Sequence, residues 1–97
     1  MQHLNLSDLP IRVKNLTKIR YPLPDYPDCV AYADVAIDNV ATVYAVKLYK
    51  REGIYKAEFT GNPETVTFSI GGIPVSDRKL SARILQAVED EYKEDFQ

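Results

Sequence analysis

The sequence predicts an α+β domain in which an antiparallel sheet of four or five strands is followed by one long C-terminal helix. Between residues 11 and 70, polar and apolar residues alternate in short stretches that are separated by turn residues, which is typical of antiparallel strands. From residue 77 to 95, apolar residues instead recur at every third or fourth position, as they do on one face of a helix. A run of strands that precedes a single helix is typical of the α+β class.

Five stretches fit the strand pattern, and their ranges are 11–21, 29–38, 41–50, 54–59 and 66–70. The first two are joined by "YPLPDYPD", whose prolines exclude a helix or a central strand. In the second strand, alternation places Ala31, Ala33, Val35 and Ile37 on one face. Asp38 and Asn39 tolerate left-handed backbone angles, and they predict a two-residue hairpin turn.

The third strand, 41–50, is expected to place Tyr44, Val46 and Leu48 on one face, because these positions alternate. A turn through Gly53 leads to the fourth strand. The stretch "GGIPV" at 71–75 breaks the strand pattern and leads into the helix.

The helix is predicted to begin after Ser76, whose hydroxyl suits an N-cap. One apolar stripe then runs along it, and we expect this stripe to lie on the sheet. Its members are Leu80, Ile84, Ala87, Val88 and Tyr92.

The length of 97 residues predicts a single domain, with residues 1–10 as a flexible N-terminal tail. The net charge of −2 is too small to indicate a partner. Its distribution is uneven, because the helix begins with cations and ends with acids, against the direction that the helix macrodipole favours.

The single cysteine, Cys29, excludes an internal disulfide and favours a reducing cytoplasm. Neither an apolar run of membrane-spanning length nor a secretory signal is visible in the sequence. We therefore expect a cytoplasmic protein that does not enter a membrane.

Catalysis is not expected, and neither is a cofactor or a metal. His3 is the only histidine and has no cluster of ligand-type residues near it, so a metal site is not predicted. Cys29 falls within a strand pattern and is interpreted as a small core or edge residue rather than a nucleophile.

Basic residues gather at two places that we take as candidate nucleic-acid contacts. Alternation predicts one cationic face on the first strand, and the second group lies at the helix start, where free amides also attract anions. The residues are Arg12, Lys14, Lys18 and Arg20 on the strand, and Arg78, Lys79 and Arg83 at the helix. A solvated surface, or a positive edge that prevents unwanted strand pairing, is the alternative for the strand group.

Four tyrosines fall on the predicted strands: Tyr32, Tyr44, Tyr49 and Tyr55. Aromatic rings on a sheet can stack on bases, but the paired-aromatic signature of an RNA-recognition sheet is missing. Packing between neighbouring strands is therefore the favoured use of these rings.

The order of these elements resembles that of the stage V sporulation protein G (SpoVG) family, the septation regulators. The stretches "AYADVAID", "VYAVKLYK", "GIYKAEF" and "IPV" are similar to those of the family. The C-terminal "ILQAVEDEY" is the most specific, because the family closes its helix with the residue types found here at Ile84, Ala87, Val88, Glu91 and Tyr92. The resemblance covers roughly residues 11–93, within a SpoVG-like domain at 11–95.

This resemblance implies a small cytoplasmic bacterial regulator that binds nucleic acid, either DNA or RNA, and forms a homodimer through its sheet. It also suggests a link to septation or sporulation. Two positions depart from the family pattern: "FTGNPET" stands where the family has a basic cluster, and Ser81 replaces the first of two helix cations, while Arg83 matches the second. The alternative function is a non-catalytic dimeric interaction module that has lost nucleic-acid binding.

Overall fold

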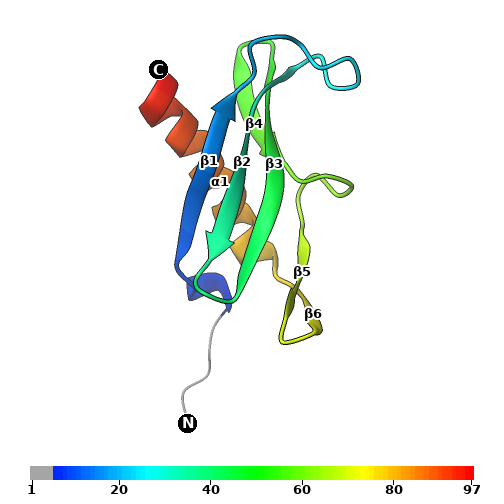
Figure 1. Ribbon diagram of the computed structural model, residues 1–97, viewed down its shortest axis with the longest axis vertical. Coiled ribbons are helices and arrows are strands. Elements are labelled where there is room, and N and C mark those ends of the chain that lie inside the picture. Colours follow the sequence, from blue (N-terminus) through cyan, green and yellow to red (C-terminus); the bar gives the residue numbers. More distant parts are fainter. Residues whose placement is uncertain (1–5) are drawn as a thin grey trace.

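The computed structural model describes residues 6–97, and it has one helix packed on one face of a four-stranded antiparallel sheet, with a separate two-stranded hairpin beside them (Figure 1). The predicted α+β class is confirmed. The strand order of the larger sheet is β1-β2-β3-β4, and β5 pairs only with β6. The elements are η1 (Leu6–Asp8), β1 (Ile11–Lys18), β2 (Cys29–Ile37), β3 (Ala41–Arg51), β4 (Ile54–Glu58), β5 (Thr67–Ile70), β6 (Ile73–Ser76) and α1 (Arg78–Phe96).

In Figure 1, α1 runs behind the larger sheet. The core lies between the helix and the face of the sheet that it covers. The alternate residues of β2 that were predicted to share a face are all buried, and two of them are alanines, which lets the helix approach the central strands closely. Four of the five stripe residues of the helix are buried as expected, Leu80, Ile84, Val88 and Tyr92, whereas Ala87 is only partly buried. Burial of this apolar surface is the main stabilising term for the domain.

The opposite face of the larger sheet carries no helix, and we call it the open face. Strand register assigns its side chains, because residues paired across an antiparallel ladder point to the same side. The open face comprises Arg12, Lys14 and Thr17 of β1, Tyr32, Asp34 and Ala36 of β2, and Thr42, Tyr44 and Lys47 of β3.

The segment 19–28 covers one end of the open face. Lys47 places its Nζ atom 4.8 Å from the ring centre of Tyr26 in this segment. Beneath it, the paired residues Cys29 and Tyr49 are buried. Only the other end of the open face, at the start of β1 and β3, remains uncovered by this segment.

A β-bulge interrupts β1 at Asn15 and another interrupts β3 at Ala45. Both residues have left-handed backbones, with φ of 55° and 54°, and the ladder registers shift at both places. Each bulge inserts one residue and exchanges the faces of the side chains that follow it. The expectation that Tyr44 shares a face with Val46 and Leu48 is therefore wrong: Val43, before the bulge, is the residue buried on their side, and Tyr44 points outward.

The segment 67–76 forms the β5–β6 hairpin, which the sequence prediction missed. Gly71 and Gly72 form its turn, with φ of 58° and 80°, and positive φ at both central residues is what a type I′ hairpin turn requires. The expected fifth strand is therefore present as β5, but it pairs with β6 and does not join the larger sheet. Similarly, the turn after β2 contains three residues rather than the expected two, because Ile37 pairs with Ala41.

The start of the chain and the helix cap also differ from expectation. Residues 6–10, predicted to be part of a flexible tail, include η1 and the buried Leu9; the remainder of the predicted tail, with His3, lies outside the described residues. The N-cap is Asp77 rather than Ser76, because β6 continues through Ser76. The Asp77 carboxylate accepts a hydrogen bond of 2.8 Å from the Leu80 amide, and a negative charge there suits the macrodipole.

Replacing Ile84 by Ala is expected to lower the free energy of unfolding by about 2–5 kcal/mol, because its side chain is fully buried and the change leaves a cavity under the sheet. Chemical denaturation would measure this loss. Lys79→Ala, an exposed position of the same helix, should change stability by no more than about 0.5 kcal/mol. A near-neutral result for Ile84→Ala would contradict the assignment of the core.

Candidate nucleic-acid interface

The four basic residues predicted to form one face of the first strand do not share a face. Arg12 pairs with Ala36 and Lys14 with Asp34 on the open face, whereas Lys18 pairs with the core residue Ala31. The bulge at Asn15 causes this exchange. The expectation of a single cationic strand face is therefore wrong.

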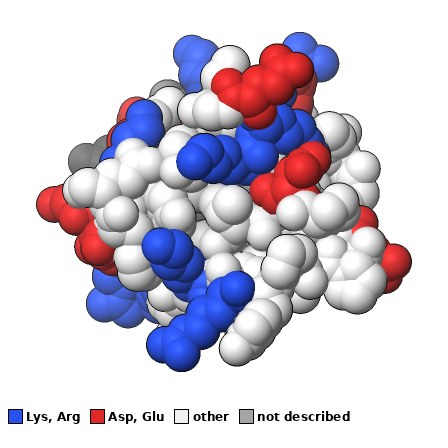
Figure 2. Space-filling view, turned by 90° about the horizontal axis from the view of Figure 1, so that it is seen from above, with Lys and Arg blue, Asp and Glu red and all other residues white. Residues whose placement is uncertain are grey.

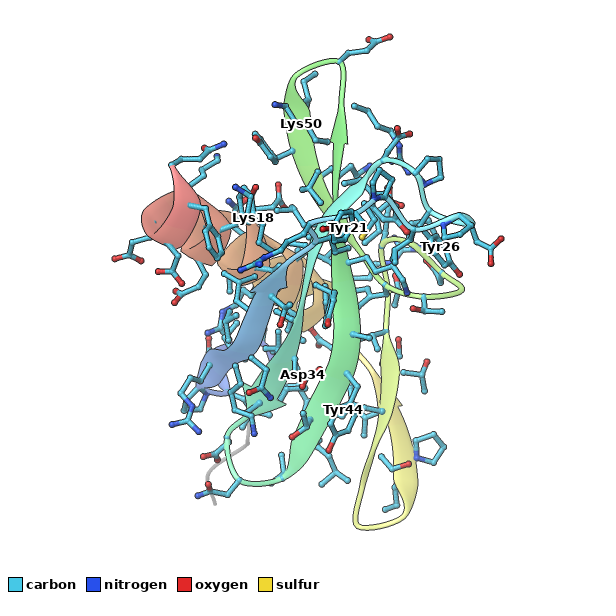
Figure 3. The ribbon with its side chains drawn as sticks, turned by 45° about the horizontal axis from the view of Figure 1, so that its top comes forward. Lys18, Tyr21, Tyr26, Asp34, Tyr44 and Lys50 are labelled. Atoms are coloured by element: carbon cyan, nitrogen blue, oxygen red, sulfur yellow. The ribbon has the colours of Figure 1, made fainter. Side chains whose placement is uncertain are left out.

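Lys18 and Arg20 lie away from the other two cations. The Lys18 ammonium lies 5.6 Å from the ring centre of Phe96, at the C-terminal end of α1, and Figure 3 shows Lys18 toward this end of the helix. Arg20 follows the end of β1 and belongs to the segment 19–28. Neither residue can join Arg12 and Lys14 on a common contact surface of the strand.

The three cations at the helix start also divide. Arg83 donates from Nη1 to the Ser7 carbonyl at 2.6 Å and to the Leu9 carbonyl at 2.8 Å. Arg83 thereby anchors the N-terminal segment to the helix. Arg78 and Lys79 remain exposed at the first turn of α1, so of the three candidate cations at the helix start they are the two that remain available to a ligand.

Figure 2 shows one end of the molecule, where Lys and Arg side chains stand in several groups with uncharged surface between them. Acidic side chains lie among and beside these groups in the same view. The basic residues therefore do not merge into one continuous face at this end.

A shallow hollow of about 390 Å³ lies on the uncovered end of the open face. Arg12 and Lys14 line it from β1, and Tyr44 lines it from β3. Within residues 6–97, neither cation forms an ion pair, since the ion pairs there belong to Arg51. We call this place the open-face hollow, and it combines two unpaired cations with an exposed aromatic ring. Asp38 also contributes to its lining.

Asp34, on the open face of β2, accepts hydrogen bonds from both bulges. Its Oδ1 atom accepts from the Ala45 amide at 3.0 Å, and its Oδ2 atom accepts from the Asn15 side-chain amide at 3.1 Å. Left-handed backbone costs a residue such as alanine about 1–2 kcal/mol, and the hydrogen bond from Ala45 to a carboxylate offsets this cost. Asp34 and Tyr44 therefore occupy neighbouring strands at the same level of the sheet (Figure 3).

The tyrosines of the sheet divide between packing and exposure. Tyr49 is buried, and Tyr55 contacts the ring of Tyr92 at 5.3 Å between centroids. This contact is with α1 and not, as expected, with a neighbouring strand. Tyr32 and Tyr44 are exposed instead, at 41% and 73%. The sequence signal for the outward turn of Tyr44 is the spacing of three between Val43 and Val46, which strict alternation does not produce.

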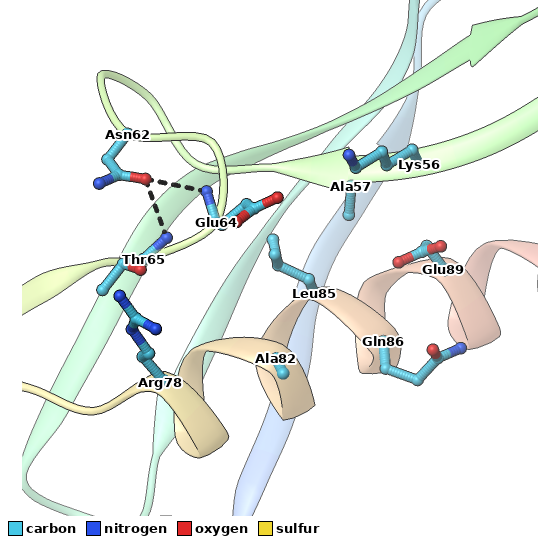
Figure 4. A pocket seen from close by; sticks show the side chains of 10 residues that line it. All are labelled: Lys56, Ala57, Asn62, Glu64, Thr65, Arg78, Ala82, Leu85, Gln86 and Glu89. Carbon is cyan, nitrogen blue, oxygen red and sulfur yellow. Dashed lines mark hydrogen bonds between the residues drawn. The ribbon is translucent and has the colours of Figure 1, made fainter.

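A second and larger groove, of about 560 Å³, runs between α1 and the segment 60–65 (Figure 4). Leu85 forms part of its floor, while Arg78, Glu64 and Glu89 are among its charged lining. Arg78 thus shares its surroundings with two carboxylates. This mixture of charges makes the helix side of the molecule a weaker attractor of polyanions than the cation count alone suggests.

The remaining candidate residues take no part in this surface. Cys29 is buried, and desolvation raises the pKa of its thiol, which makes it a poor nucleophile. Within residues 6–97, no group of three or more His, Cys, Asp or Glu side chains could hold a metal ion. In the same range, no helix combines the length and the apolar character that crossing a bilayer requires.

No family model matches the sequence, and no curated protein or solved structure matches it significantly. The functional argument for this chain therefore depends on its own residues and geometry.

Replacing Glu89 by Gln should stabilise the protein at neutral pH. Desolvation raises the pKa of Glu89 above 4.5, although a hydrogen bond from the Ala57 backbone and the charges of Lys93 and Lys56 act in the opposite direction. An acid whose pKa is raised by folding favours the protonated native state, so its contribution to stability is complete below the ordinary pKa and is lost as the pH rises through the raised pKa.

Denaturation measured from pH 7 downward tests this effect. The gap between Glu89→Gln and the wild type should close once the pH falls below 4.5, the ordinary value. Glu94→Gln, at an exposed position of α1, serves as the control for the change in net charge. A variant that is less stable than the wild type at pH 7 would contradict the role of desolvation.

Proposed function

We propose that this protein is a small, non-catalytic nucleic-acid-binding protein that contacts phosphates through the open face of its sheet. The observation that carries the proposal is the pair Arg12 and Lys14 in the open-face hollow, neither of which has an ion-pair partner among the described residues, beside the exposed ring of Tyr44. Unpaired cations next to a solvent-exposed aromatic ring suit a ligand that combines phosphate charge with flat bases.

The sequence resemblance to the SpoVG family supports the same class of function and suggests a regulator linked to septation or sporulation. Contacts made by Arg and Lys to phosphates carry no sequence information by themselves. Regulation through this surface would therefore need selectivity from another source, such as a second subunit or the shape of the nucleic acid.

The double variant Arg12→Ala/Lys14→Ala should reduce the salt dependence of nucleic-acid binding, because each lost phosphate contact lowers the slope of log affinity against log salt by about one unit. Fluorescence anisotropy, starting from about 50 mM salt where such contacts are strong, measures the slope. The matched control is Arg78→Ala/Lys79→Ala, which removes the same charge from the helix start on the other side of the sheet.

The two double variants have distinct outcomes. A slope reduced by about two only in the strand variant supports the open face. A slope reduced only in the helix variant would move the contact to the helix start, as the sequence alone suggested. Absence of binding by the wild type at about 50 mM salt would refute the nucleic-acid function.

A dimeric interaction module is the second candidate, and exposed apolar residues at strand edges favour it. Ile54 on the edge strand β4 is 69% exposed, and Ile73 on the β5–β6 hairpin is 67% exposed. The hairpin is not hydrogen-bonded to the larger sheet (Figure 1), although Phe68 of β5 packs against the core. Two-stranded hairpins are marginally stable alone, and free strand edges readily accept another chain.

We expect a homodimer formed through a sheet edge, with twice the chain mass of 11.0 kDa. Sedimentation equilibrium would measure the mass in solution at a protein concentration of about tens of micromolar, at which an obligate dimer remains associated. Ile54→Lys should shift the population toward monomer if β4 is the edge, and Ile73→Lys should do so if the hairpin is. A wild-type protein that sediments only at the chain mass would contradict this expectation.

A further inference from the structure

Two tyrosines on the open face have no partner for their rings. Within residues 6–97, the rings of Tyr26, Tyr49 and Tyr55 each contact a cation or another ring. Tyr32 and Tyr44 make no such contact, and both are exposed. An exposed ring that makes neither kind of contact is available to stack on a ligand at the sheet surface.

The two rings belong to one strip of surface. Asp34 and Tyr32 both lie on β2, two residues apart, and both belong to the open face. Tyr44 lies on the adjacent strand β3 at the level of Asp34. Lys14 pairs with Asp34 from the other side. The strip therefore runs from cations on β1 to aromatic rings on β2 and β3, within a sheet held by hydrogen bonds.

We infer that the nucleic acid bound here is single-stranded, with bases stacked on Tyr44 and Tyr32 and phosphates near Arg12 and Lys14. The inference rests on the proposed function and specifies its substrate class. A ring lying on a sheet can stack only on a base whose face is free, and such faces are available in single strands but are covered along a duplex.

The charges around the hollow favour stacking as the main source of affinity. Two cations and one carboxylate, Asp38, line the hollow, which is a modest attraction for a polyanion. Asp34, which pairs with Lys14 in the ladder, keeps its negative charge while its oxygens accept two hydrogen bonds, and it reduces this attraction further. With few phosphate contacts, stable binding has to draw on ring–base contacts, each of which contributes substantially in proteins that bind single strands.

The backbone keeps Tyr44 in place for this role. Its neighbour Ala45 occupies a left-handed conformation and donates its amide to Asp34 at 3.0 Å. The bulge directs the Tyr44 side chain away from the core, and the ring is 73% exposed. A ring whose backbone is fixed before binding loses less conformational freedom when a base stacks on it.

Fluorescence anisotropy with a labelled oligonucleotide of mixed sequence tests the inference. Its length of about 16 nucleotides is the upper end of the range that one single-strand-binding domain covers. The same sequence is presented as a single strand and as a duplex, at about 50 mM salt. We expect the single strand to bind at least about tenfold more tightly. Tyr44→Ala should weaken single-strand binding by about 5- to 150-fold, the range measured for one stacked base.

Two control variants make the result specific. Tyr44→Phe keeps the ring and should retain single-strand binding. Tyr21→Ala removes a ring that is 82% exposed but lies in the segment 19–28, and it should leave binding unchanged. Because Tyr44 is exposed, all these variants should keep the thermal stability of the wild type.

Failure of this inference differs from failure of the proposed function. Equal affinity for single strand and duplex, reduced by Arg12→Ala/Lys14→Ala but not by Tyr44→Ala, would overturn the single-strand inference and leave phosphate binding intact. A loss in Tyr21→Ala as large as that in Tyr44→Ala would also overturn it. Absence of binding to either nucleic acid would refute both.

Discussion

The Asp34 carboxylate connects two of the irregular points of the sheet, the bulges at Asn15 and Ala45. It sits in the central strand β2 and accepts one hydrogen bond from the β3 bulge and one from the β1 bulge. Ala45 would otherwise present an unpaired amide in an unfavourable left-handed conformation. By satisfying both neighbours at once, Asp34 fixes the register on both sides of β2, and the register decides which side chains meet the helix.

The consequences of the two bulges reach both faces of the sheet. On the helix side, Leu16 follows Val13 and Val46 follows Val43 at a spacing of three, which keeps apolar side chains against α1. On the open face, Lys14 of β1 and Tyr44 of β3 lie on either side of Asp34 and line one hollow, at the end that the segment 19–28 does not cover. The two bulges that bond to Asp34 therefore affect both the packing of the core and the arrangement of the candidate site.

Local periodicity was sufficient to predict the fold class, the strand β2 and the buried stripe of α1, because each depends on residues close together in the sequence. The faces of β1 and β3 were not predicted, since one inserted residue reverses the alternation. The role of Arg83 was also out of reach: its carbonyl partner on Ser7 is 76 residues away along the chain. Every basic candidate was named from the sequence, but their grouping into separate surfaces needed the register.

Amide hydrogen exchange at Ala45, followed by NMR in the wild type and in Asp34→Ala, tests the role of Asp34 most directly. The Ala45 amide should be protected in the wild type and should exchange much faster in the variant. The amide of Leu48, which is buried in the same strand, should remain protected in both proteins and so report that the sheet persists. Equal protection of Ala45 in the two proteins would contradict the account, because the bulge would then hold its position without Asp34.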